Sequence, residues 1–176
     1  MLARGIVLGI VLTLVLAGVA GAVAVVTGLL PANADATPPA WEKLIARTSL
    51  KAAILRETSR TAPNPLPVTD ENLDAGIKLY GTHCAICHGA ADGKASAIAD
   101  GLFQKAPQLA KRGVAKDPPA EVYWKISHGI RLTGMPASVH SLTENQVWQV
   151  TLFLQQMNQL PAEPKQRWEA IPSAAS

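Results

Sequence analysis

The amino-acid sequence predicts an all-α domain preceded by a single transmembrane helix. Residues 5–30 form an uncharged apolar run, long enough as a helix to cross the ~30 Å hydrocarbon core of a bilayer. Further along, apolar side chains recur at helical spacing, and no segment alternates convincingly like a strand. The sequence therefore divides into a membrane anchor at 1–30, a linker at 31–68, a helical domain at 69–160 and a C-terminal tail at 161–176.

The N-terminal run has a second interpretation as a cleaved secretory signal. Ala32, Asn33 and Ala34 resemble a small-residue cleavage site. The apolar core of a signal is typically about 7 to 15 residues long, and this run is longer, which favours a retained anchor. Either interpretation carries the rest of the chain across the membrane, because Arg4 before the run marks the cytoplasmic side.

The basic residues are unevenly distributed along the chain. The net charge is +3 and the pI is about 9.0, yet acidic and basic side chains balance within residues 69–160. The excess of basic over acidic side chains lies in Arg4 and in residues 31–68, beside the expected membrane span. This distribution favours contact with anionic lipid or with a partner at the membrane, and it argues against nucleic-acid binding.

Within the linker, residues 41–57 show an amphipathic helical pattern. Apolar and small side chains fall on one face, and basic residues recur beside it. The face comprises Trp41, Leu44, Ile45, Thr48, Ala52 and Leu55, and the basic residues are Lys43, Arg47 and Lys51. Such a helix lies on a membrane surface or docks a partner, and the alternative is that it packs on its own domain. The sequence leaves both open, and a proline-rich cluster at 62–67 ends the pattern.

Three helices are expected in the domain itself. The first follows Thr69, has acidic residues in its first turn and carries apolar residues at helical spacing. Glycines and a proline break residues 89–117, which we expect to be loop. The second helix spans about 119–128, and the glycine that follows can take a positive φ angle.

The last helix has the clearest start. Thr143 and Gln146 have the spacing of a capping box, and Leu142 and Val147 are placed as a hydrophobic staple. We expect this helix to run to about Gln159, before the next proline.

The segment Cys84-Ala85-Ile86-Cys87-His88 is the main chemical feature of the domain. Two thiols three positions apart can each add to a haem vinyl group, which holds the adjacent imidazole beneath the iron. The alternatives are half of a zinc site or a thioredoxin-like redox site. Zinc needs more ligands at matching spacing, and the chain has no further cysteine. A thioredoxin-like site needs a βαβ setting, so we expect one haem c attached through both cysteines, with His88 as proximal ligand.

Candidates for the second axial ligand are Met135, Met157, His83, His128 and His140. Met135 is favoured because it lies in the segment Thr133-Gly134-Met135-Pro136, where glycine allows close backbone approach and proline stiffens the loop. Met157 falls on the apolar register of the last helix, which favours packing. His128 and His140 keep a bis-histidine site open, and His83 is expected to be exposed.

Residues 69–160 resemble the class I mono-haem cytochromes c, and are especially similar to cytochrome domains attached to bacterial respiratory oxidases and periplasmic dehydrogenases. The motifs that carry this resemblance are Gly76 with Tyr80, Cys84 to His88, Pro107 in Ala106-Pro107-Gln108-Leu109, His128-Gly129-Ile130, Thr133 to Pro136, and the helix after Leu142-Thr143. The resemblance implies the class I cytochrome c fold around one covalent haem.

The resemblance also implies roles for individual residues. Gly76 would lie where the first and last helices cross closely, against a residue such as Phe153. The Pro107 carbonyl would accept a hydrogen bond from Nδ1 of His88. Arg131, just before the methionine loop, is a candidate to neutralise a haem propionate, and the alternative is a solvated surface arginine.

If His88 and Met135 both bind iron, no position is left for a substrate, so we expect an electron carrier and not an enzyme. The leading hypothesis is a membrane-tethered cytochrome that carries electrons between respiratory or photosynthetic complexes, from a quinol-oxidising complex to a terminal acceptor. The alternative is the haem-bearing anchor subunit of a periplasmic dehydrogenase or oxidase complex. A haem peroxidase or gas sensor would need a labile sixth ligand. We expect a single-pass protein of a bacterial inner membrane, in contact with the lipid bilayer, with its haem domain in the periplasm.

Overall fold

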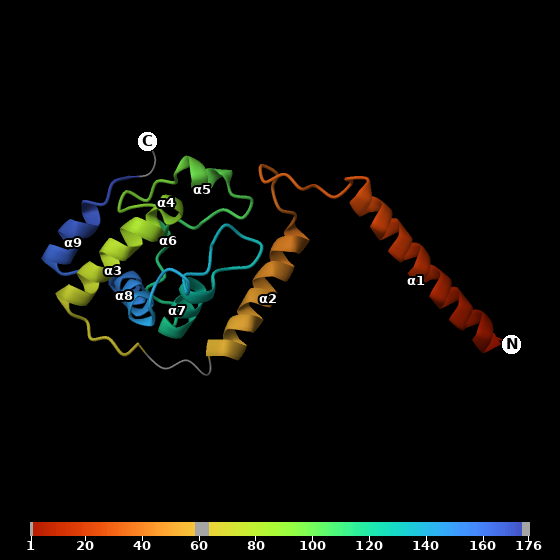
Figure 1. Ribbon diagram of the computed structural model, residues 1–176, viewed down its shortest axis with the longest axis horizontal. Coiled ribbons are helices and arrows are strands. Elements are labelled where there is room, and N and C mark those ends of the chain that lie inside the picture. Colours follow the sequence, from red (N-terminus) through yellow and green to blue (C-terminus); the bar gives the residue numbers. More distant parts are fainter. Residues whose placement is uncertain (1, 59–63, 174–176) are drawn as a thin grey trace. The chain divides into compact units, whose positions relative to one another are not determined.

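The computed structural model describes residues 2–58 and 64–173, and every regular element among them is an α-helix (Figure 1). The chain forms two compact units, Met1–Ala36 and Thr37–Ser176. The predicted all-α class is therefore confirmed. Residues 62 and 63 of the proline-rich cluster lie outside the described residues, and the helix before it ends at Thr58.

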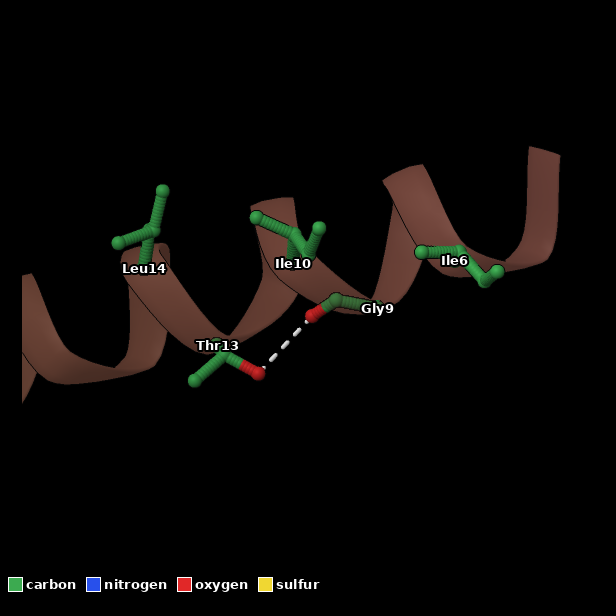
Figure 2. Close-up of a pocket in the computed structure, with 5 residues that line it drawn as sticks. All are labelled: Ile6, Gly9, Ile10, Thr13 and Leu14. Carbon is green, nitrogen blue, oxygen red and sulfur yellow. Dashed lines mark hydrogen bonds between the residues drawn. The ribbon is translucent and has the colours of Figure 1, made fainter. Parts of the chain in front are cut away.

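The first unit contains α1 (Leu2–Val26), a helix long and apolar enough to cross a membrane. Its span at Ala3–Val26 has a mean hydropathy of 2.7, and no part of the apolar window is buried in the protein. Thr13 is a polar residue near the middle of this span. Its hydroxyl donates to the Gly9 carbonyl at 2.9 Å (Figure 2). Because this bond stays within the helix, α1 exposes no unpaired hydroxyl to lipid, and it is a candidate membrane anchor.

The second unit is built on three helices: α3 (Asp70–His83), α7 (Pro119–His128) and α8 (Glu144–Gln156). Helix α8 packs against both α3 and α7 (Figure 1). Thr69 caps α3 by accepting from the backbone N–H of Asn72 at 3.3 Å. All three helices begin where the sequence predicts, and α7 also ends there.

The predicted capping box at the start of α8 is confirmed. The Gln146 side chain accepts from the Thr143 N–H at 2.8 Å, and the Thr143 hydroxyl accepts from the Gln146 N–H at 3.3 Å. The helix ends at Gln156 and not near Gln159, because the chain turns there, with the Gln159 N–H donating to the Gln156 carbonyl at 2.8 Å.

Gly76 lies where α3 and α8 cross, as the resemblance implied. A Cβ atom at this position would overlap the Gln149 carbonyl and lie 2.9 Å from the Cβ of Phe153. The two backbones therefore approach more closely than any larger residue would allow. Tyr80 and Phe153 extend the contact with ring centroids 5.4 Å apart, edge to face.

The segment 89–117 is less irregular than predicted, because it contains two short helices, α5 (Ala97–Gly101) and α6 (Leu109–Arg112). Another short helix, α4 (Ala85–His88), carries part of the cysteine segment. Helices of four or five residues are too short to produce an apolar periodicity, which explains why the sequence pattern missed them.

The structure also extends the domain beyond the expected boundary at residue 160. Helix α9 (Ala162–Glu169) lies in the segment 161–176 that was expected to be a tail, and it packs on α3. Trp168 is only 6% exposed, and its ring meets those of Tyr80 and Phe153 edge to face. A single tryptophan in a short polar helix gives no periodic signal, although it completes an aromatic cluster in the core.

The amphipathic segment of the linker forms α2 (Ala40–Thr58), which packs on α7 (Figure 1). Of the two interpretations left open by the sequence, contact with its own domain is therefore observed. The contact does not use the predicted apolar face. The residue of α2 that is buried is Ile54, which lies on the opposite side of the helix.

The helix crossing predicts different outcomes for two glycines of α3. Gly76→Ala should destabilise the domain by about 1 to 3 kcal/mol, because backbone atoms of α8 must move to admit the methyl group. Denaturant unfolding of the haem-loaded protein, followed by circular dichroism, measures this change.

Gly81→Ala is the matched control on the same helix. There the added Cβ would meet only the end of the Ile171 side chain, at 3.2 Å, and alanine favours the helix by up to ~1 kcal/mol. Equal destabilisation by the two substitutions would contradict the close crossing.

Candidate haem site

A largely apolar cavity in the second unit brings together the residues that the sequence singled out for chemistry. Cys84, His88 and Met135 all contribute to its wall. The remaining lining residues are Tyr80, Leu109, Val114, Val122, Lys125, Ile126, Val150 and Leu154. The attachment segment, α7, α8 and the methionine loop therefore surround one space, as a planar apolar cofactor requires.

The attachment segment is positioned by the end of α3. The Cys84 N–H donates to the Tyr80 carbonyl at 2.8 Å, and the His88 N–H donates to the Cys84 carbonyl at 2.9 Å. His88 thus follows Cys84 by one helical turn. Burial raises the pKa of the Cys84 thiol to about 12, with a further contribution from Cys87. Neither cysteine forms a disulfide, so both sulfurs are available for thioether bonds.

The His88 imidazole has one defined hydrogen bond, with Nδ1 2.9 Å from the Pro107 carbonyl oxygen. A carbonyl only accepts, so the Nδ1 proton is donated to it and Nε2 keeps a free lone pair. Burial lowers the pKa of His88, and the bond to Pro107 opposes this shift. The side chain is therefore a neutral imidazole with the nitrogen that binds metals available.

Gln108 joins the loop that carries Pro107 to the attachment segment. Its side-chain N–H groups donate to the Cys87 carbonyl at 3.0 Å and to the Ala106 carbonyl at 3.3 Å. No role for Gln108 was predicted from the sequence. An amide in a loop has no periodicity, so only the three-dimensional arrangement reveals this bond.

Tyr80 holds the other end of the attachment segment. Its buried hydroxyl donates to the Gly89 carbonyl at 2.8 Å, and burial raises the pKa of this phenol. Gly89 has a φ of +77°, and a Cβ there would contact Oε1 of Gln108. The segment from Cys84 to Gly89 is therefore held at both ends by hydrogen bonds to Tyr80, through its carbonyl and its hydroxyl.

The methionine loop folds back onto the end of α7 at Gly129. This glycine has a φ of +64°, as expected after the helix, and a Cβ there would lie within 2.5–2.7 Å of backbone atoms of residues 135–137. From the sequence, the close approach was expected at Gly134 instead. The atoms nearest to a Cβ at Gly134 belong to the Leu102 side chain, so the close backbone contact is found at Gly129.

Hydrogen bonds within the loop present Met135 to the cavity. The Thr133 hydroxyl accepts from the Met135 N–H at 3.1 Å and donates to the Ile130 carbonyl at 2.6 Å. The Ile130 N–H donates in turn to the Met135 carbonyl at 3.1 Å. Leu132, at the tip, has a φ of +61° and is 89% exposed.

The other candidate axial ligands lie elsewhere. His83, His128 and His140 are exposed, and none of them lines the cavity. Met157 is 8% exposed and belongs to the hydrophobic core, outside the cavity wall. Met135 is therefore the one candidate that the structure brings to the same cavity as His88.

Arg131 is exposed and does not line the cavity, so its suggested role toward a propionate stays a prediction. Lys125 is the cationic side chain among the lining residues, and it was not predicted from the sequence. Its ammonium lies 2.6 Å from Glu121 and 3.6 Å from Asp117. A lysine in the middle of a helix carries no sequence signal that separates this position from a surface one.

The donor set fits haem c and does not fit zinc. The Cys84 thiol, a neutral imidazole and a thioether line a cavity with apolar walls, and a second thiol, Cys87, stands in the same short helix as His88. This set matches a covalently attached haem. Within residues 2–58 and 64–173, no group of three or more His, Cys, Asp or Glu side chains could hold a metal ion. This observation argues against the zinc interpretation of the cysteine pair.

Comparison with protein families gives a match at residues 71–154 to the family described as cytochrome c oxidase, cbb3-type, subunit III. Comparison with curated proteins gives no match, and comparison with solved structures gives none either. The matched residues include the attachment segment, Pro107 and Met135. Residues 71–154 thus form a c-type cytochrome domain of the class I, mono-haem kind, with one haem c attached through Cys84 and Cys87.

Proposed function

We propose that this protein is a membrane-tethered electron carrier in which His88 and Met135 are the axial ligands of the haem. The observation that carries the proposal is that both side chains line the cavity beside Cys84, whereas the histidine alternatives are exposed. When bound, haem c supplies a one-electron ferric/ferrous couple. The function of the domain is thus electron transfer, and its residues hold the haem and adjust its reduction potential.

The two ligands have complementary roles. The Pro107 carbonyl fixes the orientation of the His88 ring and the position of its proton at Nδ1. The Met135 thioether favours the ferrous state and raises the reduction potential relative to a second histidine. With His88 and Met135 in both axial positions, the iron would have no position left for a substrate. This supports electron transfer and not catalysis as the function.

Helix α1 is proposed to hold the domain at a bacterial inner membrane, with the haem on the periplasmic side. Arg4 before the span supports this orientation. A tether keeps the local concentration of the domain high near a membrane partner. The proposed partners are a quinol-oxidising complex as donor and a terminal oxidase as acceptor.

A second candidate function is a fixed subunit of a redox complex such as a terminal oxidase or a dehydrogenase. It is favoured by the matched family, whose description names a subunit of a cbb3-type oxidase. Mild solubilisation of native membranes separates the two candidates. A carrier should migrate alone on a native gel stained for haem, whereas a subunit should comigrate with its complex.

Substitution of the proposed sixth ligand tests the assignment. Met135→Ala should keep the haem attached, because the two cysteines are unchanged, and should abolish the weak methionine-to-iron absorption band of the oxidised protein. The potential should fall, and the reduced protein should bind carbon monoxide. Stability should also fall, by roughly 2 to 5 kcal/mol for truncation of the methionine together with loss of its bond to iron.

Met157→Ala is the matched control, since it removes a buried thioether from the core outside the cavity. It should cost stability and leave the absorption band unchanged. If Met157→Ala abolished the band while Met135→Ala kept it, the assignment would be reversed. If neither changed the spectrum, His128 or His140 would be the ligand to test.

The proposed anchor predicts where the protein fractionates. The full chain should sediment with membranes and resist extraction by high salt, because α1 is held by apolar burial and not by charge. A truncated chain that starts near Asp35, exported by a cleavable signal, should be soluble and still carry haem. Finding that the mature native protein begins at Asp35 would overturn retention of the anchor.

A further inference from the structure

Helix α2 has two faces that differ in what they contact. One face, which includes Leu50, Ala53 and Ile54, is buried or half-buried on the domain where α2 packs on α7. The Gln104 side chain also donates to the carboxylate of Glu42 at 3.4 Å. This face fixes α2 to the cytochrome domain, so the two move together.

The opposite face of α2 exposes four large apolar side chains, which we call the open stripe. They are Trp41, Leu44, Ile45 and Leu55, with exposed fractions of 64%, 67%, 61% and 61%. Thr48 and Ala52 lie between them and are exposed as well. At about 100° per residue these six positions fall within one third of the helix circumference, opposite Ile54. The side that an isolated amphipathic helix would bury thus faces away from the domain.

Basic side chains border the open stripe along one edge. Arg47 and Lys51 are exposed and one helical turn apart, at the boundary between the open stripe and the packed face. The acidic residue Glu42 lies on the packed side of α2, where it accepts the bond from Gln104. An apolar stripe with a basic edge is complementary to the headgroup region of an anionic bilayer.

The connection to α1 keeps α2 near such a surface. Helix α1 ends at Val26 and α2 begins at Ala40. Residues 27–39 span at most about 45 Å at ~3.5 Å per residue, so an anchored chain cannot carry α2 far from the membrane. Trp41 stands in the first turn of α2, and tryptophan is enriched at membrane–water interfaces.

We propose that the open stripe of α2 docks on the anionic lipid surface of the membrane that α1 spans. The inference rests on the proposed anchorage by α1 and adds a second contact, which orients the cytochrome domain. The stripe inserts its apolar side chains among the headgroups, while Arg47 and Lys51 contact lipid phosphates. Because α2 is packed on α7, docking sets the orientation of α7 and of the cavity that it lines.

The test uses the full haem-loaded chain in nanodiscs, with a fluorophore at one introduced cysteine. The native Cys84 and Cys87 carry haem, so Thr48→Cys in the open stripe is labelled selectively. In discs containing phosphatidylglycerol the label should shift its emission to the blue, and acrylamide should quench it several-fold less than in phosphatidylcholine discs. Gln166→Cys, at an exposed site on α9, is the matched label and should be quenched equally in both.

Charge reversal completes the design. Arg47→Glu with Lys51→Glu should restore quenching of the Thr48→Cys label in phosphatidylglycerol discs. Lys78→Glu with Lys116→Glu makes the same change of charge at other exposed sites and should leave the label shielded. Retention of haem in each variant shows that the domain has formed.

The outcomes separate docking from anchorage. A label that stays open to acrylamide in anionic discs, while the protein remains in the discs, overturns docking and leaves the anchor intact. Equal shielding in both lipids overturns the preference for anionic lipid. Shielding in detergent micelles that rises with protein concentration shows that a second copy covers the stripe, and overturns the proposal. Failure of the full chain to enter nanodiscs contradicts the proposed anchorage and, because docking rests on it, the proposed docking as well.

Discussion

The close crossing of α3 and α8 at Gly76 is the constraint on which the rest of the domain depends. Helix α3 ends at the attachment segment, and α8 supplies Val150 and Leu154 to the far wall of the same cavity. The separation of these two helices therefore sets the width available to a flat cofactor. Only glycine allows the backbones to approach this closely, so one missing side chain affects the geometry of a site whose attachment segment begins about two turns further along α3.

The site itself is held by hydrogen bonds that converge on backbone carbonyls. Tyr80 donates to Gly89, Gln108 donates to Cys87, and His88 donates to Pro107. All three bonds join the attachment segment to another part of the chain, either α3 or the loop at residues 107–108. Such hydrogen bonds contribute about 1 kcal/mol each to stability, but their larger effect is that they leave the His88 ring few orientations.

The sequence predicted those parts of the structure that have local causes. The capping box at Thr143 and the start of α7 at Pro119 depend on neighbours within one turn, and both are confirmed. Covalent attachment through Cys84 and Cys87 depends on a spacing of three residues, which is also local. The proposed pairing of Met135 with His88 is not local: the glycine and proline beside Met135 favoured it, but they left the histidine alternatives open. The structure adds the shared cavity as a geometric reason.

Two features that the sequence did not predict depend on residues far apart in the chain. Trp168 lies in a polar helix and becomes core only because Tyr80 and Phe153 are already adjacent. The helical pattern of α2 is confirmed, but the face that packs on α7 carries Ile54 and not the predicted apolar residues. Periodicity shows that a helix has faces, and it does not show which face its own domain will cover.

Leu132 has a consequence for how the methionine loop moves. Leu132 has a φ of +61°, a backbone conformation that destabilises a residue with a side chain by on the order of 1 kcal/mol. Because the residue is 89% exposed, packing of its side chain offsets little of this strain. This backbone strain favours local opening of the domain at the methionine loop. If Met135 is an iron ligand as proposed, its bond to iron would oppose that opening.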